Sequence, residues 1–119
     1  MTQFSNKYDL EERTALFGRD IICLCKVCEL NHITKSIINQ LIRSATSIGA
    51  NYMEANGASS KKDFTNKIFI CKKEAQETKH WLRMLSYAID KNNDKIKELW
   101  KECQQLTLIF QKITSSLKN

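Results

Sequence analysis

The chain has 119 residues, a length typical of one domain with a single hydrophobic core. It holds no proline and only three glycines, and since turns and β-rich folds depend on both residues, this composition favours long helices joined by short loops. No apolar run reaches the roughly 18 residues of a membrane span. We expect no secretory leader from the first residues, and the five cysteines then indicate reduced thiols in the cytoplasm. The formal net charge of +6 suits an RNA or an acidic protein as partner, but solubility alone also explains it.

Apolar residues recur in steps of three and four along four segments, which is the pattern of helices that pack side by side. The predicted helices span about residues 9–29, 35–56, 61–90 and 94–117. Short polar turns separate them, and their 3.5-residue period favours left-handed packing. The sequence therefore predicts a single domain over residues 1–119 with an all-α fold, an antiparallel up-down-up-down four-helix bundle.

Local signals mark the ends of the second helix. Asn31 or Thr34 can cap its start, and Gly57 is its predicted stop. Ser60 with Asp63 three residues later resembles a capping box that starts the third helix. Gly49 lowers helix propensity by about 1 kcal/mol relative to alanine, and so small a residue inside a helix predicts a close approach by a neighbouring helix.

A second line of residues lies beside the core stripes of the second and third predicted helices. It combines carboxylates, an amide and a hydroxyl with a tryptophan: Ser47, Asn51, Glu54, Glu74, Glu77 and Trp81. A carboxylate so close to a core costs free energy unless it is paired or hydrogen-bonded. The partners available by helical spacing are Asn51, Ser47, Arg43 and Lys73. These residues predict a structural polar network in which Asn51 and Glu54 meet the carboxylates of the third helix. The alternative is an exposed row of Glu and Lys side chains that pair one turn apart, such as Lys73 with Glu77.

Apolar residues outside the main stripes exceed what one small core needs. They are Ile22 and Cys25 in the first predicted helix, and Trp100 and Ile109 in the fourth. Such broad apolar coverage predicts burial against a second copy of the chain. We expect substitution of Ile22 or Trp100 to change assembly more than folding.

Residue types that perform chemistry do not combine into a recognisable site. The cysteines of residues 23–28 occupy helical positions i, i+2 and i+5, which face different ways, so they do not form a zinc pattern. Two Glu-x-x-His elements, at residues 29–32 and 77–80, match one part of a di-iron bundle site, but the first falls at a helix end and the second faces outwards. The sequence thus predicts no catalytic residue, no metal and no cofactor.

Three stretches occur in a specific order and spacing: SIGANYMEA at residues 47–55, SKKDF at 60–64 and KEAQETKHWL at 73–82. Together they resemble the bacterial four helix bundle protein family, whose first members were called 23S rRNA intervening-sequence proteins. The accessory variability determinants of diversity-generating retroelements are related to it. The matching residues are Asn51, Glu54, Phe64, Glu74, Glu77 and Trp81.

This resemblance implies an antiparallel four-helix bundle that assembles into a homo-oligomer, often a pentameric ring, with no catalytic activity. Some members of the family are encoded inside rRNA-gene insertions. The retroelement relatives bind nucleic acid and a reverse transcriptase through a basic surface. The resemblance therefore implies self-association and suggests RNA or a nucleic-acid-associated protein as partner.

Three functions of different kinds remain open. The first is a non-enzymatic homo-oligomeric scaffold that binds RNA or an RNA-associated protein through basic residues, which neutralise phosphates without reading sequence. The candidate contacts are Arg19, Lys26, Lys35, Arg43, Lys61, Lys62, Lys72, Lys79 and Arg83. The second is a protein–protein adaptor without nucleic-acid binding, which uses exposed apolar residues around Trp81 and Trp100. The third is a metal-dependent bundle enzyme, for which the sequence offers no complete ligand set.

Overall fold

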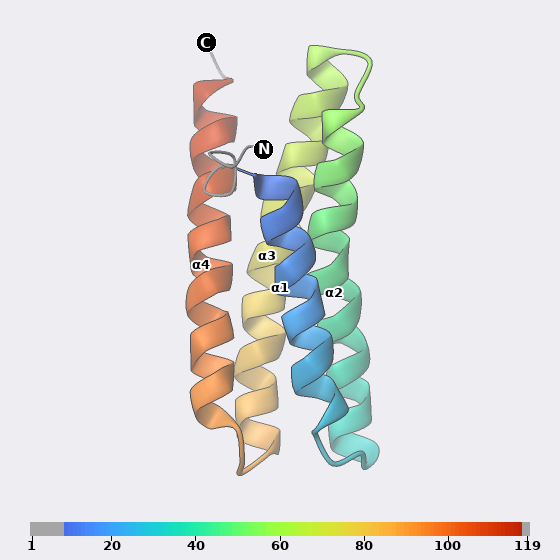
Figure 1. The fold of residues 1–119 in the computed structure, drawn as a ribbon, viewed down its shortest axis with the longest axis vertical. Helices are drawn as coiled ribbons and strands as arrows, with labels where there is room; N and C mark the ends of the chain where they lie inside the picture. The colour runs from blue at the N-terminus through green and yellow to red at the C-terminus, as the bar shows by residue number, and fades with distance from the viewer. Residues whose placement is uncertain (1–8, 118–119) are drawn as a thin grey trace.

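The computed structural model of the chain describes residues 9–117, and over this range it holds four α-helices and no strand. The helices are α1 (Leu10–Lys26), α2 (His32–Asn56), α3 (Lys61–Ala88) and α4 (Asn93–Ser116). Figure 1 shows them side by side, with the α1–α2 and α3–α4 connections at one end and the α2–α3 connection at the other. None of these four helices is long and apolar enough to cross a membrane. The predicted all-α class is confirmed.

The connection between α1 and α2 differs from the prediction because a capping box forms at Asn31. The predicted boundaries were residues 29 and 35, whereas α1 ends at Lys26 and α2 begins at His32. The Asn31 side chain accepts hydrogen bonds from the N–H groups of Ile33 and Thr34, at 2.9 and 3.0 Å. In return, the Asn31 N–H donates to Thr34 Oγ1 at 2.9 Å. These bonds satisfy donors that a helix start leaves unpaired, so α2 begins before its apolar stripe does.

The other helix ends follow local signals in the sequence. Gly57 is the C-cap of α2, and Asp63 N–H donates a hydrogen bond to Ser60 Oγ at 3.0 Å where α3 begins. α3 ends two residues earlier than predicted, because Ile89 adopts an extended backbone with φ −130° and ψ 154°. Asn92 has a φ of 66°, a left-handed conformation that asparagine tolerates better than most residues, and it leads the chain into α4.

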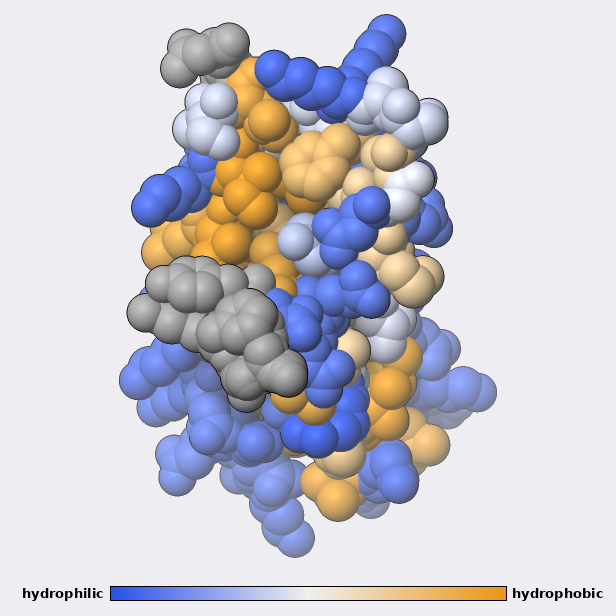
Figure 2. All heavy atoms as spheres, turned by 45° about the horizontal axis from the view of Figure 1, so that its top comes forward, coloured by the Kyte–Doolittle hydropathy of each residue, from blue (hydrophilic) through white to orange (hydrophobic). Residues whose placement is uncertain are grey.

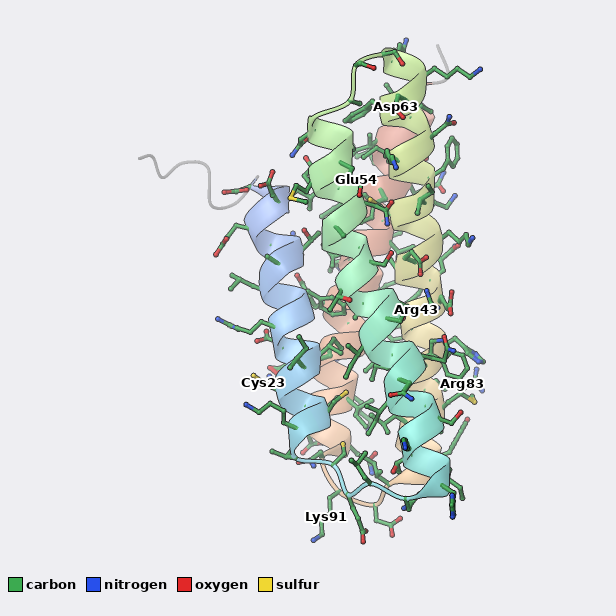
Figure 3. All side chains as sticks on the ribbon, turned by 90° about the vertical axis from the view of Figure 1, so that its right-hand side faces the viewer. Cys23, Arg43, Glu54, Asp63, Arg83 and Lys91 are labelled. Atoms are coloured by element: carbon green, nitrogen blue, oxygen red, sulfur yellow. The ribbon has the colours of Figure 1, made fainter. Side chains whose placement is uncertain are left out.

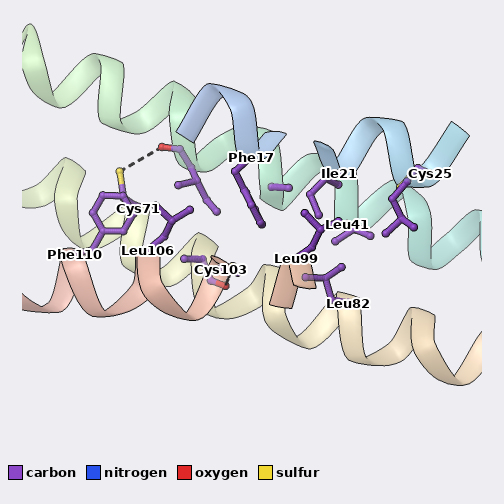
Figure 4. Close-up of a cluster of buried hydrophobic side chains, with 14 of the residues drawn as sticks. Phe17, Ile21, Cys25, Leu41, Cys71, Leu82, Leu99, Cys103, Leu106 and Phe110 are labelled. Atoms are coloured by element: carbon purple, nitrogen blue, oxygen red, sulfur yellow. Dashed lines mark hydrogen bonds between the residues drawn. The ribbon is translucent and has the colours of Figure 1, made fainter. Parts of the chain in front are cut away.

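The apolar stripes of the four helices meet in one core, part of which Figure 4 shows. Its largest side chains are at most 2% exposed, among them Phe17, Leu41, Leu82 and Phe110. α2 and α3 share the most extensive interface, whereas α1 packs mainly on α2 and touches α4 only slightly. The α2–α3 seam is therefore the central contact of the fold.

α1 is shorter than the helices that it covers. It has 17 residues against 28 in α3, which at 1.5 Å per residue corresponds to roughly 25 Å against roughly 42 Å. Figure 1 shows that α1 begins well short of the end that carries the α2–α3 connection. Apolar side chains gather on the surface at this end in Figure 2, and Phe64 and Ile113 are only partly buried.

α1 and α2 approach each other closely at Gly49, as predicted. A Cβ atom at Gly49 would lie 3.2 Å from Thr14 Oγ1, so a side chain there would press against α1. Thr14 cannot easily yield, because it is 1% exposed and its hydroxyl donates to the Leu10 carbonyl at 2.9 Å. At Gly18, in contrast, a Cβ atom would meet Thr46 Cγ2 at 3.7 Å, an ordinary van der Waals contact.

Candidate functional site

A polar group around Arg43, which Figure 3 labels, joins α2 to α3. Arg43 Nη1 donates a hydrogen bond to Glu74 Oε1 at 3.3 Å, and Arg43 Nη2 donates to Glu77 Oε2. Trp81 Nε1 donates to the same oxygen of Glu77 at 2.9 Å. We call Arg43, Glu74, Glu77 and Trp81 the Arg43 cluster.

The geometry of the Arg43 cluster suits a clamp between two helices. Glu74 is 9% exposed, a depth at which a carboxylate needs a partner, and the guanidinium supplies both charge and a hydrogen bond. Glu77 pairs with Arg43 of the neighbouring helix instead of with Lys73 of its own. Because two carboxylates already pair with Arg43, its charge is largely offset and is less available to a phosphate than that of an unpaired cation.

The remaining residues of the predicted polar network form separate pairs along the α2–α3 seam. Asn51 Nδ2 donates to the backbone and side-chain oxygens of Ser47, one turn earlier in α2, both at 2.9 Å. Glu54 accepts a hydrogen bond from Lys67 Nζ at 2.7 Å at the surface between α2 and α3. Within residues 9–117 no hydrogen bond joins Asn51 or Glu54 to the carboxylates of the Arg43 cluster. The predicted residues therefore lie in three groups along one seam.

A buried pair of hydroxyl groups, which the sequence reasoning missed, also belongs to this seam. Thr78 Oγ1 donates to the Glu74 carbonyl at 2.8 Å and lies 2.9 Å from Ser44 Oγ. Ser44 and Thr78 are both fully buried, at 0% exposure. Thr78 interrupts the apolar stripe of α3, and that interruption is the signal that could have indicated a polar partner on α2.

The basic residues predicted as nucleic-acid contacts are spread over three helices. Two lie on α1, two on α2 and five on α3: Arg19 and Lys26; Lys35 and Arg43; Lys61, Lys62, Lys72, Lys79 and Arg83. Arg19 pairs with its neighbour Asp20 at 2.9 Å, and Arg43 belongs to the Arg43 cluster. Lys61 and Lys62 begin α3, at the opposite end of the molecule from the α1–α2 connection beside Lys26.

Three of these basic residues share one face of α3, because steps of seven and four residues return to the same side of a helix. They are Lys72, Lys79 and Arg83. This face borders α4, since Lys79 Nζ lies 5.3 Å from the centre of the Trp100 ring. Arg83 likewise lies 6.0 Å from the ring centre of Tyr87. Both contacts have the geometry of cation–π interactions, which sequence reasoning did not anticipate.

The cysteines are free, and burial makes three of them unreactive. Loss of solvent on burial raises the pKa of three thiols to about 12: those of Cys25, Cys71 and Cys103. A thiol with such a pKa stays protonated at neutral pH and is a poor nucleophile or metal ligand. Cys25, which we expected to face a second copy, is only 7% exposed and belongs to the core. Across residues 9–117, no group of three His, Cys, Asp or Glu side chains is placed to hold a metal ion.

Comparison with known proteins identifies the family of this fold. The family model of the 23S rRNA-intervening sequence protein matches residues 7–112, which include α1 to α3 and most of α4. The chain is also similar to a protein of unknown function from the S23 ribosomal protein family of Bacteroides thetaiotaomicron. Its crystal structure aligns with a TM-score of 0.78 and 30% sequence identity, over 91% of this chain and 96% of that one. No curated protein matches the chain. The chain therefore belongs to the 23S rRNA-intervening sequence protein family.

Proposed function

We propose that this protein is a non-enzymatic scaffold that associates with copies of itself, as a pentameric ring, and binds RNA through a basic surface. Each subunit is an up-down-up-down bundle in which neighbouring helices run antiparallel. The observation that carries the proposal is the row of basic side chains on α3. Among residues 9–117, no ion pair involves Lys72, Lys79 or Arg83. Lys79 donates a hydrogen bond to Gln104 and Arg83 donates one to Tyr87, but neither partner offsets the positive charge. Cations without a carboxylate partner on one face suit contacts with successive phosphates.

Membership of the family adds weight to RNA as the partner. The name of the family refers to sequences that interrupt 23S rRNA. The net charge of +6 also favours a polyanion over a basic partner. Phosphate contacts of this kind position a protein on RNA without reading the bases, so we expect weak sequence preference.

Self-association has a separate apolar surface, between α1 and α2. A groove of about 430 Å³ lies there, lined mainly by small and apolar residues, among them Ala15, Gly18, Ile22, Gly49, Ala50 and Met53. Ile22 is 39% exposed and Met53 is 56% exposed. Exposed apolar side chains beside a groove favour burial against another protein surface. We assign this α1–α2 groove to the contact between subunits.

The proposal assigns no reaction to the chain. The carboxylates of the Arg43 cluster are engaged with Arg43 and Trp81, which suits a clamp better than acid–base catalysis. The three thiols whose pKa is raised to about 12 are protonated at neutral pH, and free cysteines fit the reducing cytoplasm predicted from the sequence.

The test of RNA binding is an electrophoretic shift of a structured RNA across a salt series. We expect affinity to fall with salt, and Lys79→Gln to weaken binding and reduce the salt slope by about 1. Lys112→Gln is the matched control, because it removes the same charge from an exposed position of α4 away from the α3 row. Absence of binding at low salt would overturn the proposal.

A protein partner is a second candidate, which an apolar cluster at the α1–α2 connection favours. Val27, Leu30 and Ile33 are 68%, 67% and 66% exposed. Capture of partners from a lysate, with and without nuclease, separates the two candidates. Capture that survives nuclease and is lost in Leu30→Ser would support an adaptor, whereas capture that nuclease abolishes would support RNA.

A further inference from the structure

We propose that the face formed by α3 and α4 seats a single-stranded segment of nucleic acid, with unpaired bases stacked on Trp100 and Tyr87. This inference rests on the proposed function and deepens it. Binding to phosphates needs only positive charge, whereas this face requires bases that are free of pairing.

The two rings border a hollow between the end of α3 and the start of α4. Its volume is about 370 Å³, and its lining includes Arg83, Tyr87, Lys97 and Trp100. Trp100 is 38% exposed and Tyr87 is 70% exposed, so each ring presents a surface to the outside. Aromatic surfaces of this kind stack unpaired bases without regard to sequence, because every base has a π-face.

Rings and cations alternate along this face beyond the hollow. Phe69, 43% exposed, lies 6.0 Å from Lys72 Nζ at one end, and Tyr87 lies 6.0 Å from Arg83 at the other. Lys79 lies between Phe69 and Tyr87 along α3, and Trp100 of α4 lies beside Lys79. Tyr87 lies eighteen positions after Phe69, which at 1.5 Å per residue is roughly 27 Å. A single strand offers the complementary alternation of bases and phosphates over a similar length.

Two carboxylates of α4, those of Glu98 and Glu102, line a second hollow beside Trp100, and each of them is paired with a cation. Glu102 pairs with Arg13 of α1 at 2.7 Å, and Glu98 pairs with Lys95 at 2.8 Å. Lys97, in contrast, lines the first hollow, and no ion pair within residues 9–117 involves it. The face therefore offers positive charge to a polyanion.

The positive charge of this face, together with its exposed rings, favours a single strand over a second copy of the chain or a duplex. Two copies meeting through this face would bring like charges together, which is unfavourable. A duplex would reach the cations but would keep its bases stacked inside, so the exposed rings would gain nothing. A single strand satisfies both the rings and the cations.

The experiment compares a fluorescently labelled 12-nucleotide uridine strand with a blunt 12-base-pair RNA duplex by anisotropy at one salt concentration. We expect Trp100→Ala to weaken binding of the strand by roughly 5- to 150-fold, the range for loss of one stacked base. We expect Trp100→Phe to retain most of the affinity, and the duplex to bind both variants as it binds the unaltered protein. Circular dichroism melts check that each variant is folded.

The controls separate this inference from the proposed function. Lys97→Gln should weaken both ligands, and Lys112→Gln, about four turns away on α4, should weaken neither. If Trp100→Ala weakens strand and duplex equally, or neither, stacking is refuted while RNA binding stands. If neither ligand binds the unaltered protein, the proposed function fails and the inference fails with it. If Trp100→Ala changes the mass of the assembly and leaves strand affinity unchanged, the face is a contact between copies and the inference is overturned.

Discussion

Replacement of Arg43 by methionine is expected to destabilise the fold, because it leaves two carboxylates of α3 without their partner. The methionine keeps most of the apolar stem, so the change removes charge and hydrogen bonds more than packing. The side chain of Glu74 is 12% exposed and that of Arg43 is 46% exposed, so solvent screens the charge of Arg43 and hardly reaches that of Glu74. The contribution of this pair to stability should therefore lie between two values. An exposed ion pair contributes about 0.2–1 kcal/mol, and a buried charged hydrogen bond contributes about 1.5–3 kcal/mol.

We expect Arg43→Met to lower the free energy of unfolding by about 1–2 kcal/mol, which for a domain of this size lowers the melting temperature by roughly 3–8 °C. The measurement is a double-mutant cycle with Glu74→Gln, followed by urea denaturation of all four proteins. Because the two residues contact each other, the double variant should lose about 1 kcal/mol less than the sum of the single losses. Additivity within about 0.3 kcal/mol would refute the view that Arg43 stabilises the buried carboxylate.

Three further predictions concern stability and assembly. Gly18→Ala is expected to stabilise the protein by about 0.5–1 kcal/mol through helix propensity. Gly49→Ala should instead lower the melting temperature, because its Cβ atom would lie 3.2 Å from the buried hydroxyl of Thr14. Equal effects of the two variants in thermal melts would contradict this contrast. Burial raises the pKa of three thiols from an ordinary 9.0 to about 12: Cys25, Cys71 and Cys103. The unfolded chain ionises these thiols first, so the stability that they supply is complete below pH 9 and is lost as the pH rises towards 12. Urea denaturation at pH 8 and about 10.5 should show this loss, and Cys103→Ala, tested as a second protein, should show a smaller one; an identical pH dependence would be inconsistent with the cause. Ile22→Asp should reduce the mass of the assembly in sedimentation while leaving the helical content unchanged, and an unaltered mass would count against the α1–α2 groove as the subunit contact.

Apolar spacing was sufficient to predict the four helices, because steps of three and four leave little freedom once a helix must bury a stripe. The α1–α2 connection was the exception. There the boundary depends on hydrogen bonds between Asn31 and Thr34, which act outside the apolar pattern. The sequence identifies Asn31 as a cap candidate, but the position of the boundary depends on these bonds forming on both sides of the cap.

The candidate sites could be predicted less completely, because helical spacing assigns residues to faces but does not choose partners for long side chains. Helical spacing offers Arg43 both as a phosphate contact and as a partner of the carboxylates, and only the packed helices show that its guanidinium joins Glu74 and Glu77. Trp100 was expected to face a second copy on apolar character alone. Its contact with Lys79 depends on the rotation of α3 against α4, which becomes known only when the helices are packed.

The short reach of α1 has a consequence for how the protein opens. α1 is held mainly by α2, whereas α3 has more extensive interfaces with both α2 and α4. Elements with fewer buried contacts open at lower free energy than the whole molecule. Hydrogen exchange should therefore show the amides of α1 exchanging through a partial opening, whereas those at the α2–α3 seam exchange only through global unfolding. A helix that detaches alone would also carry away one wall of the α1–α2 groove, so association between subunits would hold α1 in place and slow its exchange.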